Sequence, residues 1–122
     1  MATRNRIHAH ELKASADREQ LIVIDHGESY HDGVKATWLA ADVHDCITVA
    51  RWDGFQWWIT LTEVGGSTRD VERFYAVDAD DVVSTLVKVA DRELFNREAR
   101  ERLDRWHAVR RVIRNRRYGF PL

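Results

Sequence analysis

Alternating apolar and polar positions dominate the middle of the chain and predict β-strands there. Between residues 34 and 40, apolar side chains recur at every second position, which is the period of a strand with one buried face. Residues 21–25 form an aliphatic run that ends in an aspartate, typical of a strand buried on both faces. The stretch 26–33 contains two glycines and predicts a loop.

The strongest local signal is Asp53-Gly54 between two β-rich runs, which is typical of a two-residue type I′ hairpin turn. Such a turn would place Trp52 opposite Phe55 and Ala50 opposite Trp57. One face of this hairpin is then predicted to belong to the core, because side chains alternate between faces. That face holds Cys46, Thr48, Ala50, Trp52, Phe55, Trp57, Ile59 and Leu61.

Helical spacing replaces alternation towards the C-terminus. After a last strand over 71–77, apolar residues recur at helical spacing over 82–94. A second helix is expected over 97–117, separated from the first at Asn96; a single long bent helix is the alternative. A further short helix is expected over 11–19. Strands followed by helices predict an α+β fold. The expected sheet is antiparallel, with about four to six strands, followed by two C-terminal helices, the last rich in Arg.

Length and composition fit one folded domain over 1–122, with 44% apolar residues and five Trp. A loose tail is expected over 1–5, mainly strands over 21–77 and helices over 78–117. Neither a secretory signal nor a run long enough to span a membrane is visible. Cys46 is the single cysteine, so no internal disulfide is expected. These features predict a cytoplasmic protein that does not bind membranes.

Charge is unevenly distributed along the chain, although the net charge is −1. Residues 21–96 carry 6 basic and 14 acidic side chains, whereas residues 97–117 carry nine Arg and three acids. Asymmetry of this kind indicates either an anionic partner or self-association.

The C-terminal arginines are the first candidate site. On a helical wheel Ala99, Leu103, Trp106 and Ile113 form a narrow apolar stripe. Acids at i,i+4 spacing compensate the first arginines of this helix, but no acid lies within reach of Arg110, Arg111, Arg114, Arg116 and Arg117. The planar guanidinium binds phosphate oxygens bidentately, which favours a phosphate-bearing ligand. The alternatives are a contact with the helix dipole in solvent, with the acidic body or with a second subunit.

The outer face of the predicted hairpin is the second candidate site. Trp58 is flanked there by Ile47, Val49 and Arg51, and an exposed indole is a stacking platform for a base. The alternative is that a helix or a second subunit covers this face.

Acidic and histidine side chains lie close in sequence at two places, in and beside predicted loops: Asp25, His26, Glu28, His31 and Asp32, and then Asp42, His44 and Asp45. These residue types bind zinc and manganese, but no spacing matches a known metal motif. No nucleophile motif and no glycine-rich phosphate loop is present either. We therefore expect no catalytic residue, no metal site and no cofactor. A metal-dependent enzyme that uses His26, His31 and His44 is the third alternative.

The sequence thus predicts a non-catalytic binding protein for a phosphate-bearing ligand, either nucleic acid or a small or cyclic nucleotide. The expected ligand-binding residues are Arg110, Arg111, Arg114, Arg117, Arg51 and Trp58. The alternative is a protein-interaction module, such as an inhibitor, immunity or host-takeover factor, that acts through the Trp58 face or the basic helix. A homo-oligomer, with a dimer preferred, is expected in either case because one small domain cannot cover this much apolar surface.

The predicted order of elements resembles, in architecture, that of phage proteins that sequester cyclic nucleotide immune signals. Those proteins can place two C-terminal helices after an antiparallel sheet and hold phosphates with arginines near a subunit interface. Arg110, Arg111 and Arg114 stand equally late in this chain. The resemblance implies a nucleotide ligand and extends to no sequence motif.

Overall fold

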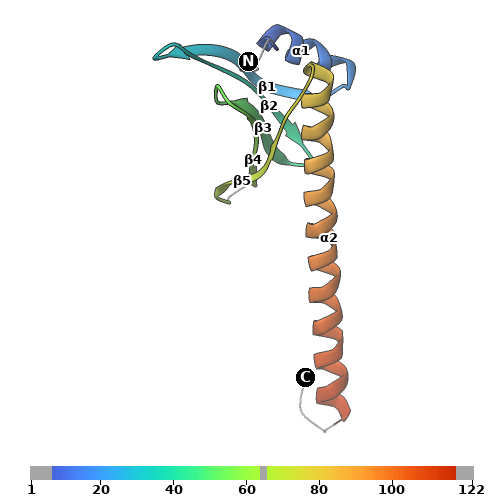
Figure 1. The fold of residues 1–122 in the computed structure, drawn as a ribbon. Coiled ribbons are helices and arrows are strands. Elements are labelled where there is room, and N and C mark those ends of the chain that lie inside the picture. The colour runs from blue at the N-terminus through green and yellow to red at the C-terminus, as the bar shows by residue number, and fades with distance from the viewer. Residues whose placement is uncertain (1–6, 64–65, 118–122) are drawn as a thin grey trace. The chain divides into compact units, whose positions relative to one another are not determined.

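The computed structural model describes residues 7–63 and 66–117, with residues 113–117 described as helix backbone only (Figure 1). The expected loose tail over 1–5 lies outside the described residues. Contacts divide the chain into two compact units, Met1–Asp91 and Arg92–Leu122. We call them the first and the second unit.

Five antiparallel strands form one sheet in which neighbours in sequence are neighbours in space, in the order β1-β2-β3-β4-β5. This meander, with helices before and after it, confirms the α+β prediction and the antiparallel sheet. The elements are α1 (Ala9–Arg18), β1 (Ile22–His31), β2 (Val34–Val43), β3 (Cys46–Trp52), β4 (Trp57–Glu63), β5 (Thr68–Phe74) and α2 (Ala79–Arg117).

A single helix, α2, follows the sheet and continues through Asn96, so the predicted division into two C-terminal helices is not found. The physical reason is the absence of a helix breaker. Neither Pro nor Gly occurs between residues 79 and 117, and one Asn costs only a fraction of a kcal/mol, roughly 0.7 or less, in a helix. The architectural resemblance to cyclic-nucleotide-sequestering proteins depended on two C-terminal helices after the sheet, and the structure has one helix there.

The β3–β4 hairpin has a four-residue connection instead of the predicted two-residue turn. Trp52 pairs with Trp57, so Phe55 lies in the turn and is exposed rather than in the core. The cause is the side chain of Asp53, whose Oδ1 accepts hydrogen bonds of 2.8 Å from the backbone N–H groups of Phe55 and Gln56. A shift of two residues keeps every side chain on its face, and the rest of the predicted core face is buried.

The first hairpin corrects two further predictions. β1 extends through His31, so the stretch 26–33 is not a loop and the turn is confined to Asp32-Gly33. Both turn residues have positive φ, 52° and 77°, as a type I′ turn requires. Ile22 and Ile24 are exposed, so this strand is not buried on both faces. β1 is instead an edge strand of the sheet.

The core of the first unit lies on one face of the sheet, where α1 and the first turns of α2 pack. Its fully buried members include Leu12, Ala16, Leu39, Ala50, Trp57, Ile59, Val82, Val83 and Leu86. Asp80 also ties the two helices, because Oδ1 accepts hydrogen bonds from Ser15 Oγ (2.6 Å) and Arg18 Nη2 (2.8 Å). Both helices of this unit therefore serve the same face of the sheet.

One flaw in this core generates a prediction. The hydroxyl of Thr48 is fully buried and, among the described residues, has no hydrogen-bond partner. Valine has nearly the same shape without the polar atom, so Thr48→Val removes an unsatisfied group at no cost in volume. We expect the free energy of unfolding, measured by urea denaturation, to rise by about 1 kcal/mol.

The matched control is Thr60→Val in the adjacent strand. Thr60 Oγ1 donates a 3.0 Å hydrogen bond to Asp70, so this variant should gain nothing. Equal stabilisation by the two substitutions would contradict the assignment of the buried hydroxyl as unsatisfied.

Candidate functional site

The face of the sheet opposite the core carries a row of alternating indole and guanidinium groups. Cross-strand pairing aligns Trp38 with Arg51, Arg51 with Trp58, and Trp58 with Arg73. Directly paired residues project from the same face of a sheet, so these four side chains lie side by side across strands β2 to β5. We call them the Trp–Arg row. Both arginines are exposed and both tryptophans are partly exposed.

Trp38 is held in place by its neighbours on β1. Its Nε1 donates a 2.9 Å hydrogen bond to Asp25, and its cross-strand partner on that side is Gly27. A Cβ atom at Gly27 would lie only 2.6 Å from Cζ2 of the indole. The ring therefore rests against a position that only glycine can occupy without displacing it.

Trp58 is fixed in a comparable way. Its Nε1 donates a 2.7 Å hydrogen bond to Asp53 Oδ2, and the guanidinium carbon of Arg73 lies 5.3 Å from the ring centroid, within cation–π range. Partial burial raises the pKa of Asp53, but hydrogen bonds donated by Gln56, Trp58 and Phe55 outweigh it and hold this pKa below its usual value of 3.8. The same carboxylate thus sets the turn and orients an indole.

Arg51 lies between the two indoles. Neighbouring strands are about 4.8 Å apart, so the backbone positions of the two tryptophans are about 10 Å apart. Arg51 is thus placed between two indole-bearing positions, and the guanidinium of Arg73 lies over the ring of Trp58. The row combines aromatic faces with cations, which is the combination that nucleic-acid bases and phosphates require.

The carboxylates nearest the row are already engaged by other donors. Asp25 and Asp53 accept the indole N–H groups, and Asp70 accepts the hydroxyl of Thr60. Among the ion pairs of the described residues, none joins these acids to Arg51 or Arg73.

Two of the six predicted site residues, Arg51 and Trp58, are brought together in this row. Arg110 and Arg111 are exposed on α2 in the second unit. The side chains of Arg114 and Arg117 lie outside the described part of the chain. The predicted C-terminal site therefore stays a prediction.

The sequence reasoning missed Trp38 and Arg73. A signal for Trp38 was present in the two residues His44-Asp45, which have positive φ of 55° and 63° and form the two-residue turn between β2 and β3. Recognising that turn would have fixed the β2–β3 register and placed Trp38 beside Arg51. Arg73 depends on an irregularity in β4–β5 pairing between Ile59 and Thr60, for which the sequence carries no signal we recognise.

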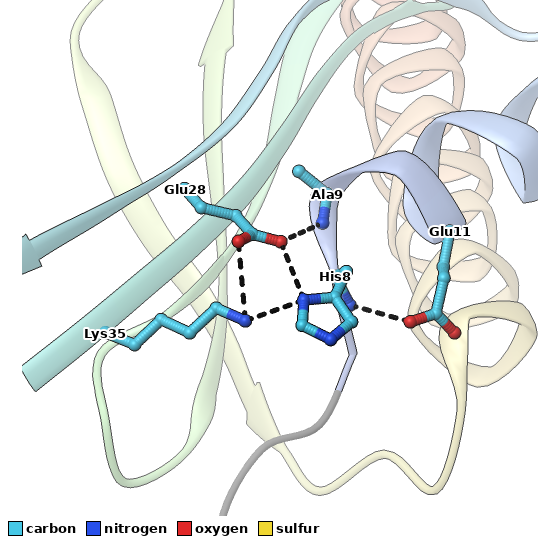
Figure 2. A network of polar contacts seen from close by, with 5 residues as sticks. All are labelled: His8, Ala9, Glu11, Glu28 and Lys35. Atoms are coloured by element: carbon cyan, nitrogen blue, oxygen red, sulfur yellow. Dashed lines mark hydrogen bonds and ion pairs between the residues drawn. The ribbon is translucent and has the colours of Figure 1, made fainter.

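A second polar cluster joins α1 to the first hairpin (Figure 2). Glu28 Oε1 accepts a 2.6 Å hydrogen bond from the backbone N–H of Ala9, which is one of the unpaired donors at the start of α1. Lys35 Nζ lies 3.4 Å from the other carboxylate oxygen and 2.9 Å from Nδ1 of His8. The hydrogen bond from Ala9 is the main reason that the pKa of Glu28 lies below 4.5; burial opposes it, and Lys35 and His8 add to the lowering.

Nδ1 of His8 is shared between two neighbours. It lies 2.9 Å from Lys35 Nζ and 3.2 Å from Glu28 Oε1, and the tautomer of the imidazole determines which of these contacts is a hydrogen bond. These contacts fasten α1 to the sheet.

In the part of the chain that the structure describes, no three His, Cys, Asp or Glu side chains lie close enough together to hold a metal ion. His26 and His31 lie on β1 instead of in the predicted loop. His44 lies in the β2–β3 turn, and its Nε2 is 2.7 Å from Asp91. The residues of the third alternative are thus distributed over separate elements.

A further candidate is a hollow between α1 and α2 within the first unit. Its volume is about 220 Å³, and it is lined by Ser15, Glu19, Asp80, Ser84, Val87 and Lys88. Ligand pockets usually measure roughly 300–1,000 Å³, so the hollow is small for a nucleotide.

No protein-family model, curated protein or solved structure matches this chain. Among the described helices, none is both long enough and apolar enough to cross a membrane.

The turn carboxylate yields a prediction. Replacing Asp53 by Ala removes three hydrogen bonds to one carboxylate, and we expect the free energy of unfolding to fall by about 1–3 kcal/mol. The indole N–H resonance that disappears or shifts on substitution should be that of Trp58, measured by NMR. Asp104→Ala, an exposed aspartate on α2, is the control and should change neither quantity appreciably.

The contact between Glu28 and α1 yields a second prediction, on pH. Glu28 has a lowered pKa in the folded state, so its stabilisation is fully present above the unfolded pKa of about 4.5 and disappears as pH falls through the folded pKa. Glu28→Gln should lower the free energy of unfolding by about 1–2 kcal/mol at neutral pH.

The difference between the wild type and Glu28→Gln should shrink in urea denaturation below about pH 4.5. Glu19→Gln removes the same charge from the exposed end of α1 and serves as the control. A difference that stays constant down to pH 3 would show that the carboxylate of Glu28 does not hold α1.

Proposed function

We propose that this protein is a non-catalytic binding protein for a phosphate-bearing ligand that contains a base, a nucleotide or a nucleic acid. The observation that supports this proposal is the Trp–Arg row, in which two oriented indoles flank an exposed arginine on the face opposite the core. In this proposal the bases stack on Trp38 and Trp58, and Arg51 and Arg73 contact phosphates.

The row is suited to this role because its geometry is fixed before a ligand arrives. Both indole N–H groups are bound to carboxylates, so neither ring loses much rotational freedom when a base stacks on it. Stacking on an aromatic side chain is worth roughly 1–3 kcal/mol per base. Arginine adds charge-assisted hydrogen bonds to phosphate oxygens.

The arginines of the second unit form the other part of the proposal. Arg110 and Arg111 are exposed, and they stand with Arg114 and Arg117 in a segment that contains no acid after Asp104. They would supply phosphate contacts in addition to those of the sheet face.

The alternative is a protein-interaction module that uses the same face of the sheet. It is favoured by Ile47, whose side chain is 43% exposed on the face that carries the Trp–Arg row. An apolar side chain beside exposed arginines is also common in protein interfaces.

The test is the affinity for a short fluorescein-labelled single-stranded oligonucleotide, measured by anisotropy. Trp58→Ala and Trp38→Ala should each weaken binding by roughly 5- to 150-fold, the loss of one stacked base. Phe55→Ala is the matched control because Phe55 is an exposed aromatic residue of the adjacent turn and does not belong to the row.

Arg51→Gln should weaken binding and reduce its dependence on salt, by about 0.7 in the log–log slope for each phosphate that the protein no longer neutralises. The paired change Arg110→Gln and Arg111→Gln tests the second unit in the same assay. Unchanged affinity in the two tryptophan variants would overturn the role of the row, and absence of binding by the wild type would favour the interaction module.

A further inference from the structure

The second unit presents an apolar stripe that is open to solvent. Phe95, Leu103, Trp106 and Val109 are 64%, 53%, 55% and 51% exposed, and every residue from 101 to 112 is exposed. Large apolar side chains that gather on one exposed helix face mark an interaction site.

The spacing of the stripe is that of a helix pair. Residues 95, 99, 102, 106 and 109 follow one another at intervals of four, three, four and three, which is the a/d pattern of a coiled coil, and Leu103 lies at the side of this seam. Phe95, Ala99, Trp106 and Val109 are apolar, and Arg102 is the one charged residue among the five. A partner helix therefore fits this stripe better than a flat surface does.

The charges on this helix distinguish between the two directions of pairing. All acids of the second unit lie in its first half, at positions 93, 98, 101 and 104, whereas Arg105 is followed by five more arginines and no acid. Two parallel copies would place one arginine half against the other, and like charges across a helix pair are destabilising. Antiparallel copies place each arginine half against the half that contains the acids.

We propose that a second copy of this chain covers the stripe, with the two helices antiparallel. In antiparallel pairs, an a position lies opposite a d position of the other helix. Ala99 then lies opposite Val109, and Arg102 lies opposite Trp106. The one charged residue of the stripe thereby meets an indole face, to which a guanidinium binds by a cation–π interaction.

This inference is independent of ligand binding by the sheet face, since it uses residues of the second unit alone. It specifies the expected homo-oligomer further, because it names the residues of the interface and the antiparallel orientation of the two helices. Arg111, which lies on the side of the helix away from the stripe, is free of the seam in this arrangement and can still serve a phosphate ligand.

The first experiment is the native mass of the full chain by light scattering across a dilution series from about 100 µM downward. The wild type should be a dimer, and Trp106→Gln should raise the dimer dissociation constant by roughly 30-fold or more, as expected for a central aromatic anchor. Ala108→Gln, on the opposite side of the same helix, is the matched control and should remain dimeric. A monomeric wild type at the highest concentration would overturn the proposal.

The second experiment tests whether the two helices pair antiparallel or parallel. Ala99→Cys and Val109→Cys are made as separate proteins, with the wild type as a control for buried Cys46. Under mild oxidation, an equimolar mixture should form a disulfide-linked dimer, whereas each variant alone should not. Efficient cross-linking of Ala99→Cys to itself would show parallel pairing, and no cross-link in any sample would show that the stripe is not the seam.

Discussion

The register of the three central strands is the constraint on which the outer face of the sheet depends. Trp38, Arg51 and Trp58 come from three different strands and meet only because two turns, at His44-Asp45 and at Asp53, have their observed lengths. A change of one residue in either turn would move an indole to the opposite face, and a change of two would move it about 7 Å along its strand. Asp53 is the critical residue because its carboxylate determines one of these lengths.

Much of the first unit could be predicted from alternation alone. The core face of the β3–β4 hairpin was correct except at Phe55, because a shift of two residues does not change which face a side chain occupies. The turn itself was not predictable from Asp53-Gly54. The same dipeptide type at Asp32-Gly33 does form a two-residue turn, but the Asp53 side chain bonds the backbone beyond it. Propensity cannot distinguish these cases, since the difference lies in a side-chain hydrogen bond.

The candidate site was predictable only in part for the same reason. Arg51 and Trp58 are neighbours within one hairpin, so their proximity follows from local sequence. Trp38 comes from another hairpin, and its alternation with Ala36 and Ala40 gives no indication that their shared face is the outer one. The end of α2 was readable as an arginine-rich helix, but its continuation from the preceding helix was only the alternative to a boundary at Asn96. That boundary was wrong because one Asn costs too little to interrupt a helix.

The glycine beneath Trp38 restricts how this protein can vary during evolution. Any side chain at position 27 would collide with the indole, so a mutation there is tolerated only if position 38 has already lost its large ring. The two sites should therefore covary across homologues, glycine with tryptophan and larger residues with smaller ones. Sequences that keep both residues would be the ones to have inherited the same Trp–Arg row, and this pair offers a way to recognise distant relatives in which little else is shared.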